Sequence, residues 1–175
     1  MQKLRKMLGD IESSQSAALM RLIETQSKKT LAAWAVSYAK ENYLEIYESR
    51  CPEDLRLREA VSACEGFLKG LLSNQEIKSI LKETRQIAQN QKDDPIAQAA
   101  ARAVSTACGT LQTPTNAYGF LFYGAAAVSY SKAGLDQRAE KYDQLAEEEF
   151  EKALCSLRQA AIPDEAHPAK IKWNC

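Results

Sequence analysis

The alanine-rich stretch from Asp94 to Gly134 limits what this 175-residue chain can fold into more than any other segment. It reads DPIAQAAARAVSTACGTLQTPTNAYGFLFYGAAAVSYSKAG and predicts two helices, which begin at Asp94-Pro95 and near Thr113–Thr115. The small side chains allow two helix axes to approach closely, so both helices are expected to be buried. Neither apolar face carries paired carboxylates, a histidine cluster or a glycine-rich phosphate loop, so this central segment shows no catalytic motif.

Helix signals also fill the first half of the chain, whereas the alternating patterns and turn pairs typical of strands are nearly absent. Residues 2–25 predict one or two amphipathic helices, with Gly9 as the point where they would separate. Ser27 is expected to cap a further helix that runs to about Ser49.

Two more helices are predicted by their end signals. One is expected after Pro52, with Asp54 as its N-cap and Gly70 as its end. Ser73 and Glu76 then form the S-x-x-E pattern of a capping box, which predicts the start of the next helix.

The last long helix is expected over residues 136–161, and the proline-containing tail 162–175 cannot continue it. We expect Trp173 to hold this extended tail. The predicted fold is all-α: a single-domain, irregular bundle of six to eight helices over residues 1–175. Its parts are an N-terminal helical segment (1–25), a core (26–161) and the tail. No repeat of the length found in helical solenoids is evident, which favours a bundle.

Charge and hydropathy argue against two classes of partner. The chain has 23 Lys and Arg residues and 23 Asp and Glu residues, and this neutral balance is unlike that of nucleic-acid-binding proteins. The longest apolar stretch, Ala117–Tyr130, is shorter than the roughly 20 residues that a membrane span needs, so it predicts a central core helix. We therefore expect neither a nucleic acid nor a membrane as partner.

The five cysteines are an odd number, are widely spaced and include no C-x-x-C pair. Three of them, Cys64, Cys108 and Cys155, fall within helical patterns, where a thiol behaves as a small buried hydrophobic group. The first residues, MQKLRKMLGDIESS, lack the apolar run of a signal peptide. These features predict reduced cysteines and a cytoplasmic protein.

The inventory of reactive side chains favours a binding protein over an enzyme. His167 is the only histidine, which excludes a histidine-based catalytic pair and a multi-histidine metal site. A cysteine nucleophile would need a nearby base, and none is evident. The Glu-x-x-His motif of di-iron bundles is also absent. The sequence thus predicts no catalytic residue, no metal site and no cofactor.

Three segments resemble the all-helical immunity proteins of bacterial polymorphic toxin systems. Residues 31–35, LAAWA, resemble the family's LAxWA segment, and residues 52–60, PEDLRLREA, are similar to its PxDxRPRxA segment. The third segment is the AARA of residues 100–103 with the turn after it, where five positions match: Thr110, Pro114, Thr115, Ala117 and Gly119. The resemblance covers residues 30–134 and implies that the partner is a cognate protein toxin.

The chain departs from this family pattern at four positions. Leu57 stands where the family usually has proline. Histidines are usual in the family around the alanine-rich turn, and the matching residues here are Thr106, Gln112 and Asn116. These departures argue against any role that depends on an imidazole at these positions, such as metal binding or proton transfer.

Two sets of charged residues that include arginines are candidates for the contact with the partner. Asp54, Arg56 and Arg58 open a helix and form either a solvated, capped first turn or a polar contact surface, since arginine is frequent at interface hot spots. Arg102 interrupts the alanine-rich face. It reaches solvent, pairs with a carboxylate such as Asp54 or Glu59, or contacts the partner.

An acidic run on the last helix is the third candidate. Glu147, Glu148, Glu149 and Glu151 form either a solvated helix face or a mimic of nucleic-acid phosphates that blocks the basic cleft of a nuclease toxin. Of these, we predict Glu147, Glu148 and Glu151 to bind the partner. Trp34, with Tyr38, lies on the apolar side of its helix and is expected in the core.

The resemblance thus predicts an immunity protein that neutralises a toxin by stoichiometric binding and steric occlusion, as a monomer or weak homo-oligomer. Two alternatives stay open from the sequence. One is a self-associating helical scaffold, in which the alanine-rich helices pack between protomers. The other is a small enzyme with a carboxylate site.

Overall fold

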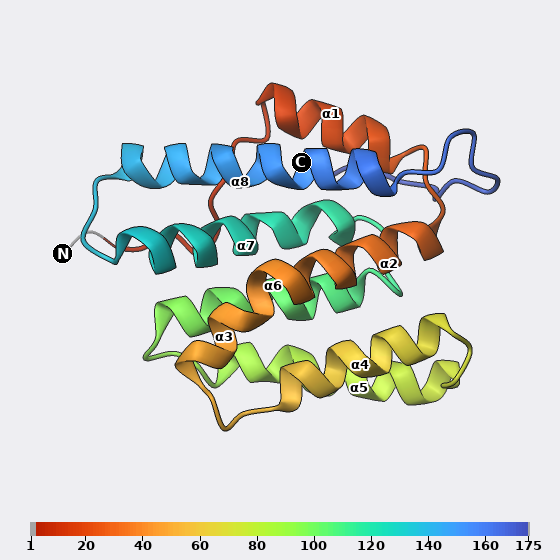
Figure 1. Ribbon diagram of the computed structural model, residues 1–175, viewed down its shortest axis with the longest axis horizontal. Helices are drawn as coiled ribbons and strands as arrows, with labels where there is room; N and C mark the ends of the chain where they lie inside the picture. Colours follow the sequence, from red (N-terminus) through yellow and green to blue (C-terminus); the bar gives the residue numbers. More distant parts are fainter. Residues whose placement is uncertain (1–2, 175) are drawn as a thin grey trace.

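The computed structural model describes residues 3–174, and all regular structure in that range is helical (Figure 1). In chain order the elements are α1 (Ser14–Ile23), α2 (Lys28–Ala39), the π-helix η1 (Lys40–Leu44), α3 (Glu45–Arg50), α4 (Arg56–Leu68), α5 (Asn74–Gln89), α6 (Pro95–Gly109), α7 (Asn116–Ala133) and α8 (Ala139–Ala160). Because α2, η1 and α3 follow one another without interruption, they form one long helix. The described residues therefore confirm the predicted all-α, multi-helix fold.

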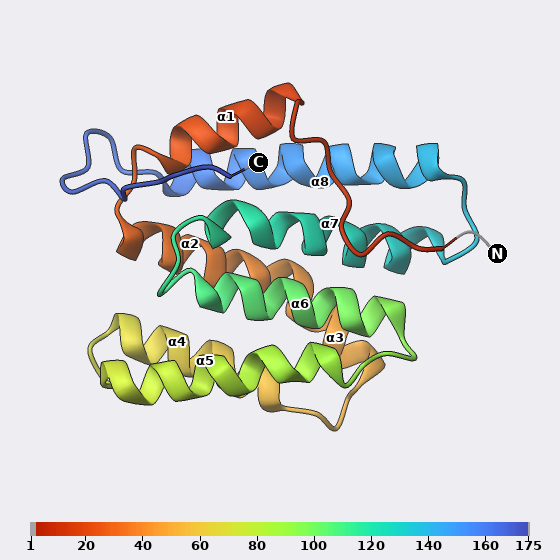
Figure 2. The ribbon, with the colours of Figure 1, turned by 180° about the vertical axis from the view of Figure 1, so that it is seen from behind.

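The helices are stacked in an order that differs from their order in the chain (Figures 1 and 2). The pair α4 and α5 lies at one end of the stack, and α8 with α1 lies at the other. Between them, α6 contacts α2, α5 and α7, and α7 also contacts α8. The central position of α6 and α7 explains why these two helices are the most apolar of the chain.

The alanine-rich helices pack against each other inside this chain. Their buried alanines are Ala97, Ala99, Ala100, Ala101, Ala103, Ala107, Ala117, Ala125, Ala126 and Ala127. The small side chains let α6 and α7 lie close along their lengths. These faces are therefore not available to a second protomer, which removes the basis on which the scaffold alternative rested.

Most helix starts follow the predicted caps. The Ser27 hydroxyl accepts the Thr30 backbone N–H at 3.1 Å and so caps α2. Ser73 and Glu76 form the expected reciprocal capping box at the start of α5. Asp94 caps α6, whose first residue is a proline that has no N–H to satisfy.

Two predicted helix starts are wrong by a few residues. The N-cap of α4 is Leu55, whereas the Asp54 carboxylate accepts the Arg56 backbone N–H from outside the helix at 3.1 Å. Helix α8 begins at Ala139 rather than at residue 136. The reason is local: the Tyr142 hydroxyl donates to the Gly134 carbonyl at 2.7 Å and holds the preceding turn in a non-helical shape.

The N-terminal segment is the main correction to the predicted fold, because residues 3–13 are not helical. They run across α7, where the Leu8 backbone N–H donates to the Phe122 carbonyl at 3.1 Å (Figure 2). Gly9 has a positive φ of 137°, and a Cβ there would lie 2.7 Å from the Phe150 ring. Tertiary contacts with α7 and α8 therefore override the local helical pattern. Residue 2 of the predicted helix lies outside the described residues.

The long helix that begins after Ser27 has the predicted extent but not the predicted regularity. The π-helix η1 inserts an additional residue and so rotates the faces of α2 and α3 relative to each other. As a result Tyr38 on α2, Tyr43 on η1 and Tyr47 on α3 are all buried. The expected core position of Trp34 and Tyr38 is confirmed, since their side chains are 5% and 3% exposed.

The C-terminal tail is extended and pinned to the bundle, as predicted. The Trp173 indole N–H donates to Glu24 at 2.5 Å, and its ring lies 5.6 Å from the Tyr118 ring. The Ala169 backbone N–H donates to the Gln26 carbonyl at 2.8 Å. These contacts tie the tail to the turn between α1 and α2.

The apolar stretch Ala117–Tyr130 lies within α7 in the core, as predicted. In the described part of the chain no helix is long and apolar enough to cross a membrane. Cys64 and Cys108 are buried as expected, whereas Cys155 is exposed on α8. That prediction is wrong because Cys155 lies on the solvent side of an amphipathic helix whose opposite face is buried. Cys175 lies outside the described residues.

Candidate functional site

The predicted arginines at the start of α4 are engaged in ion pairs within the chain. Arg56 makes two hydrogen bonds to Asp54, at 2.8 and 2.7 Å. Arg58 makes two to Glu48 of α3, at 2.8 and 2.5 Å. The hydrogen bonds from Arg56 hold the pKa of Asp54 well below its usual value, and those from Arg58 lower the pKa of Glu48. Since Tyr47 also donates to Asp54, this arginine cluster ties the turn after α3 to α4.

Arg102 does not make the predicted pair with Asp54 or Glu59. Its side chain is half-buried on α6 and has no ion pair within residues 3–174. Asp54 is instead satisfied by Arg56, its neighbour two residues along the chain. A position in the middle of the central helix leaves Arg102 less accessible than the residues at the ends of the stack.

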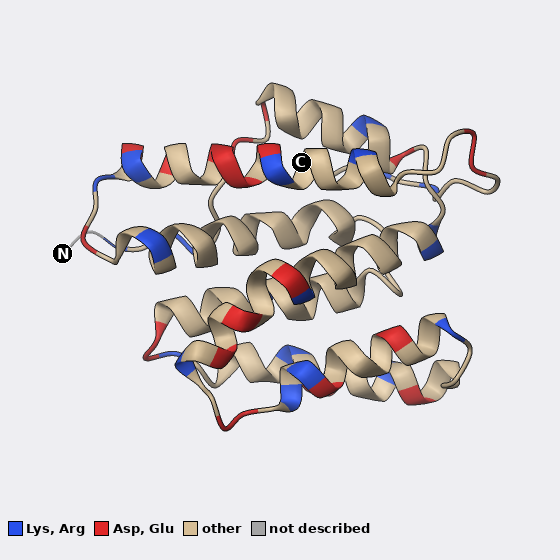
Figure 3. Cartoon of the chain, in the orientation of Figure 1, with Lys and Arg blue, Asp and Glu red and all other residues tan. Residues whose placement is uncertain are grey.

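Acidic residues of α8 are coloured red in Figure 3. Three of the four glutamates in the acidic run lie on the solvent side of this helix. Glu147, Glu148 and Glu151 are exposed, and within the described chain none of them forms an ion pair with lysine or arginine. Their charges are therefore not neutralised by a neighbouring side chain. We call these three residues the acidic face of α8.

A groove with mostly acidic walls adjoins this face. It has a volume of about 720 Å³ and lies between the N-terminal segment and α8. Its carboxylates come from Asp10, Glu140, Asp143 and Glu147. Arg5 pairs with Asp143 at 2.7 Å and is the one cation among the described residues that line the groove.

Glu149 belongs to the core, contrary to the expectation that the whole acidic run is solvated. Its side chain is 4% exposed and accepts the hydroxyl protons of Tyr38 and Tyr43 at 2.7 and 2.9 Å. Burial, with the nearby charge of Glu149, raises the pKa of both tyrosines. The apolar spacing that includes Ala146 and Phe150 places residue 149 on the inward face of α8, and this is the signal in the sequence for its burial.

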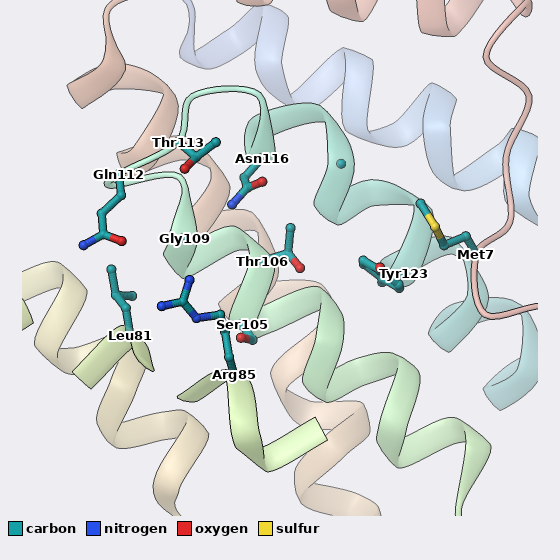
Figure 4. A pocket seen from close by; sticks show the side chains of 11 residues that line it. Met7, Leu81, Arg85, Ser105, Thr106, Gly109, Gln112, Thr113, Asn116 and Tyr123 are labelled. Carbon is teal, nitrogen blue, oxygen red and sulfur yellow. The ribbon is translucent and has the colours of Figure 1, made fainter. Parts of the chain in front are cut away.

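A second kind of site lies where α5, α6, α7 and the N-terminal segment meet (Figure 4). We call it the polar pocket, a cavity of about 340 Å³. It is lined by Met7, Leu81, Arg85, Ser105, Thr106, Gly109, Gln112, Thr113, Asn116, Gly119 and Tyr123. Sequence reasoning did not find it, because its walls come from segments that are far apart in the chain.

The polar pocket brings together the three positions where this chain departs from the family's histidines. Thr106 lies on α6, Gln112 in the turn, and Asn116 at the start of α7 (Figure 4). A Cβ at Gly109 would lie 2.6 Å from the Asn116 amide nitrogen, so this glycine makes room for the amide. The three side chains give this wall of the pocket hydroxyl and amide groups. Histidines at the same positions would instead supply imidazole nitrogens, which can bind a metal ion or a proton.

The structure does not gather the predicted partner-binding residues on one surface. The arginine cluster lies on α3 and α4 at one end of the stack, and the acidic face of α8 lies at the other (Figures 1 and 2). Among residues 3–174, no group of three or more His, Cys, Asp and Glu side chains could hold a metal ion.

The stack of helices around an alanine-rich pair defines an all-helical protein within the described residues. The model of the family "Imm-5 like putative immunity protein" matches residues 21–154. The match covers more than half of the chain, which therefore belongs to this immunity-protein family. No curated protein and no solved structure was found to match the chain.

Proposed function

We propose that this protein neutralises a cognate bacterial toxin by binding to it and covering its active site or the path of its substrate. Membership of an immunity-protein family carries the proposal and supports a binding role. A steric inhibitor needs a preformed surface, and a stable complex typically buries about 800 Å² on each partner. The packed helical stack, with charged residues on the solvent sides of its helices, supports such a role.

Of the predicted contact residues, the acidic face of α8 is the best supported. Its glutamates are exposed and unpaired, so binding to a basic surface would not first require breaking an ion pair. The adjoining acidic groove extends the same charge, and Ile11 at its edge is 48% exposed, which offers an apolar contact. The toxin surface that fits here is a basic one, as in a nuclease cleft.

The arginine cluster and Arg102 are a weaker proposal for the same contact. Arg56 and Arg58 already use their paired donors within the chain, and a partner would have to compete with Asp54 and Glu48. Exposed ion pairs contribute little to stability, so breaking them would cost the fold little free energy. The free energy spent on breaking them would still lower the net affinity for the partner.

Co-expression with the toxin encoded beside this protein tests the proposal, with growth as the readout. Wild-type protein is expected to restore growth, and the triple variant E147K/E148K/E151K is expected to lose protection. A matched control is E53K/E59K/E83K, which changes the net charge equally at exposed residues on other elements. Loss of protection in the control alone, or in R56E/R58E alone, would move the contact away from α8.

The stoichiometry is tested separately by light scattering of the purified mixture. We expect a complex with one copy of each protein, formed in solution without loss of either chain. Toxin that is chemically altered after incubation, as judged by intact mass, would contradict a purely steric mechanism.

A further inference from the structure

The polar pocket concentrates hydrogen-bonding groups that have no partner in the chain. Seven of its lining side chains are polar: Arg85, Ser105, Thr106, Gln112, Thr113, Asn116 and Tyr123. None of these side chains makes a hydrogen bond or ion pair within the described residues. All seven can donate a proton in a hydrogen bond, and no lining residue carries a carboxylate. The hydroxyl and amide groups can also accept, but Arg85 can only donate, and no lining carboxylate neutralises its charge.

Arg85 supplies the positive charge of this site. It projects from α5, and its guanidinium lies near Gly109 and Gln112 at the edge of the pocket (Figure 4). Arg5, Arg56 and Arg58 are held by carboxylates, whereas Arg85, like Arg102, has no carboxylate partner within residues 3–174. A guanidinium without a partner matches the planar, bidentate geometry of a carboxylate or phosphate.

Ser105 places a further hydrogen-bonding group on the inner wall of the pocket. Its side chain lines the pocket from α6 although the residue is only 7% exposed. Its hydroxyl makes no hydrogen bond to a described residue and is not among the fully buried unsatisfied atoms, so it opens onto the pocket. An acceptor atom bound in the pocket would satisfy the Ser105 hydroxyl.

We infer that the polar pocket binds an oxyanion, either a carboxylate or a phosphate group, between Arg85 and the hydroxyl and amide donors of α6 and α7. The volume of about 340 Å³ is at the lower end of the range for ligand sites, which suits one small charged group. This site is distinct from the acidic face of α8 and does not depend on toxin binding.

Titration of the purified full-length protein with inorganic phosphate and, separately, with N-acetylglutamate tests the inference. Backbone amide NMR shifts are recorded at constant ionic strength, with chloride as the reference anion. We expect saturable shifts around residue 85 and residues 105–123 for at least one probe. A response to phosphate alone indicates a phosphate-bearing ligand, and a response to N-acetylglutamate alone indicates a carboxylate-bearing ligand.

Two variants and one control make the test specific. Arg85→Gln is expected to weaken binding about tenfold or more, because it removes a charge-assisted pair. Gly119→Leu fills the pocket from α7, where a Cβ meets no atom within 4 Å. Arg158→Gln on α8, an exposed arginine outside the pocket, is expected to bind like the wild type.

The amide spectrum of each variant also reports its fold, so loss of binding is scored only on a folded protein. The inference is overturned if neither anion produces saturable shifts in the wild type, or if the shifts spread over the surface lysines. It is equally overturned if folded Arg85→Gln and Gly119→Leu both bind as tightly as Arg158→Gln.

Discussion

Gly124 of α7 admits the ring of Tyr43, because a side chain at Gly124 would collide with the ring and hydroxyl of Tyr43. This close approach allows the Tyr43 hydroxyl to reach Glu149 on α8 at 2.9 Å. The π-helix η1, the glycine on α7 and the buried carboxylate on α8 are thus parts of one arrangement. A change at any of the three is expected to disturb the other two.

Gly124→Ala is expected to destabilise the protein by about 1–3 kcal/mol, because the added methyl group overpacks the contact with Tyr43. The change opposes the usual gain of about 0.5–1 kcal/mol for alanine over glycine in a helix. Gly119→Ala on the same helix is the control, since a Cβ there meets no atom within 4 Å. Urea denaturation measures both, and a Gly124→Ala protein as stable as Gly119→Ala would contradict the packing argument.

The two tyrosines on Glu149 predict a loss of stability at alkaline pH. Burial, and then the charge of Glu149, raises the pKa of Tyr38 and Tyr43 in the folded state above the usual value of 10.0. The unfolded chain therefore loses these protons first. Their contribution to the free energy of unfolding is complete below pH 10 and decreases as the pH rises above it.

Denaturation curves recorded on both sides of pH 10 check this, with Tyr38→Phe/Tyr43→Phe as the comparison. The double variant is expected to lose less stability per pH unit, because the phenylalanines do not titrate. Equal slopes for variant and wild type would show that other groups cause the alkaline loss.

Trp34→Ala is expected to cost about 3–5 kcal/mol of stability, because it empties a buried site of aromatic size. The ring is 5% exposed, packs edge-on against Phe120 at 5.5 Å, and donates its N–H to Ser156 at 3.0 Å. Chemical denaturation measures the loss. A change of less than about 1 kcal/mol would show that the indole contributes little packing energy.

Trp173→Ala is expected to release the last residues of the tail without unfolding the bundle. The indole joins the end of the tail to Glu24 and Tyr118. Its removal leaves the earlier part of the tail bound, because Ile162 and Ala169 are still hydrogen-bonded to Gln26, and Glu165 still accepts hydrogen bonds from Ser27 and Thr30. Limited proteolysis with mass spectrometry is expected to show faster cleavage after residue 169, where the Trp173 contacts are the ones lost. Lys172→Ala, an exposed neighbour, is the control and is expected to behave as the wild type.

Helix ends were predictable where the signal is local. Ser27, Ser73 and Asp94 cap their helices because each side chain satisfies an N–H only two or three residues away. Residues 3–13 show the opposite case. Their helical pattern is outweighed by contacts with α7 and α8, more than 100 residues along the chain.

The candidate sites divide in the same way. The exposure of Glu147, Glu148 and Glu151 follows from the amphipathic period of one helix, and so does the burial of Glu149. That two tyrosines would satisfy Glu149 depends on η1 and α8 meeting in space. Thr106, Gln112 and Asn116 stood out in the sequence as departures, but their convergence with Arg85 in one pocket did not.

The sequence alone determined the all-helical class, the positions of most caps and the burial of the alanine-rich pair, because these depend on interactions within a few turns of one helix. Only the tertiary structure decided that residues 3–13 run extended across α7, that Tyr43 occupies the space at Gly124, and that four separate segments enclose the polar pocket. Each of these depends on groups that are distant in the chain, whose meeting is set by how whole helices pack.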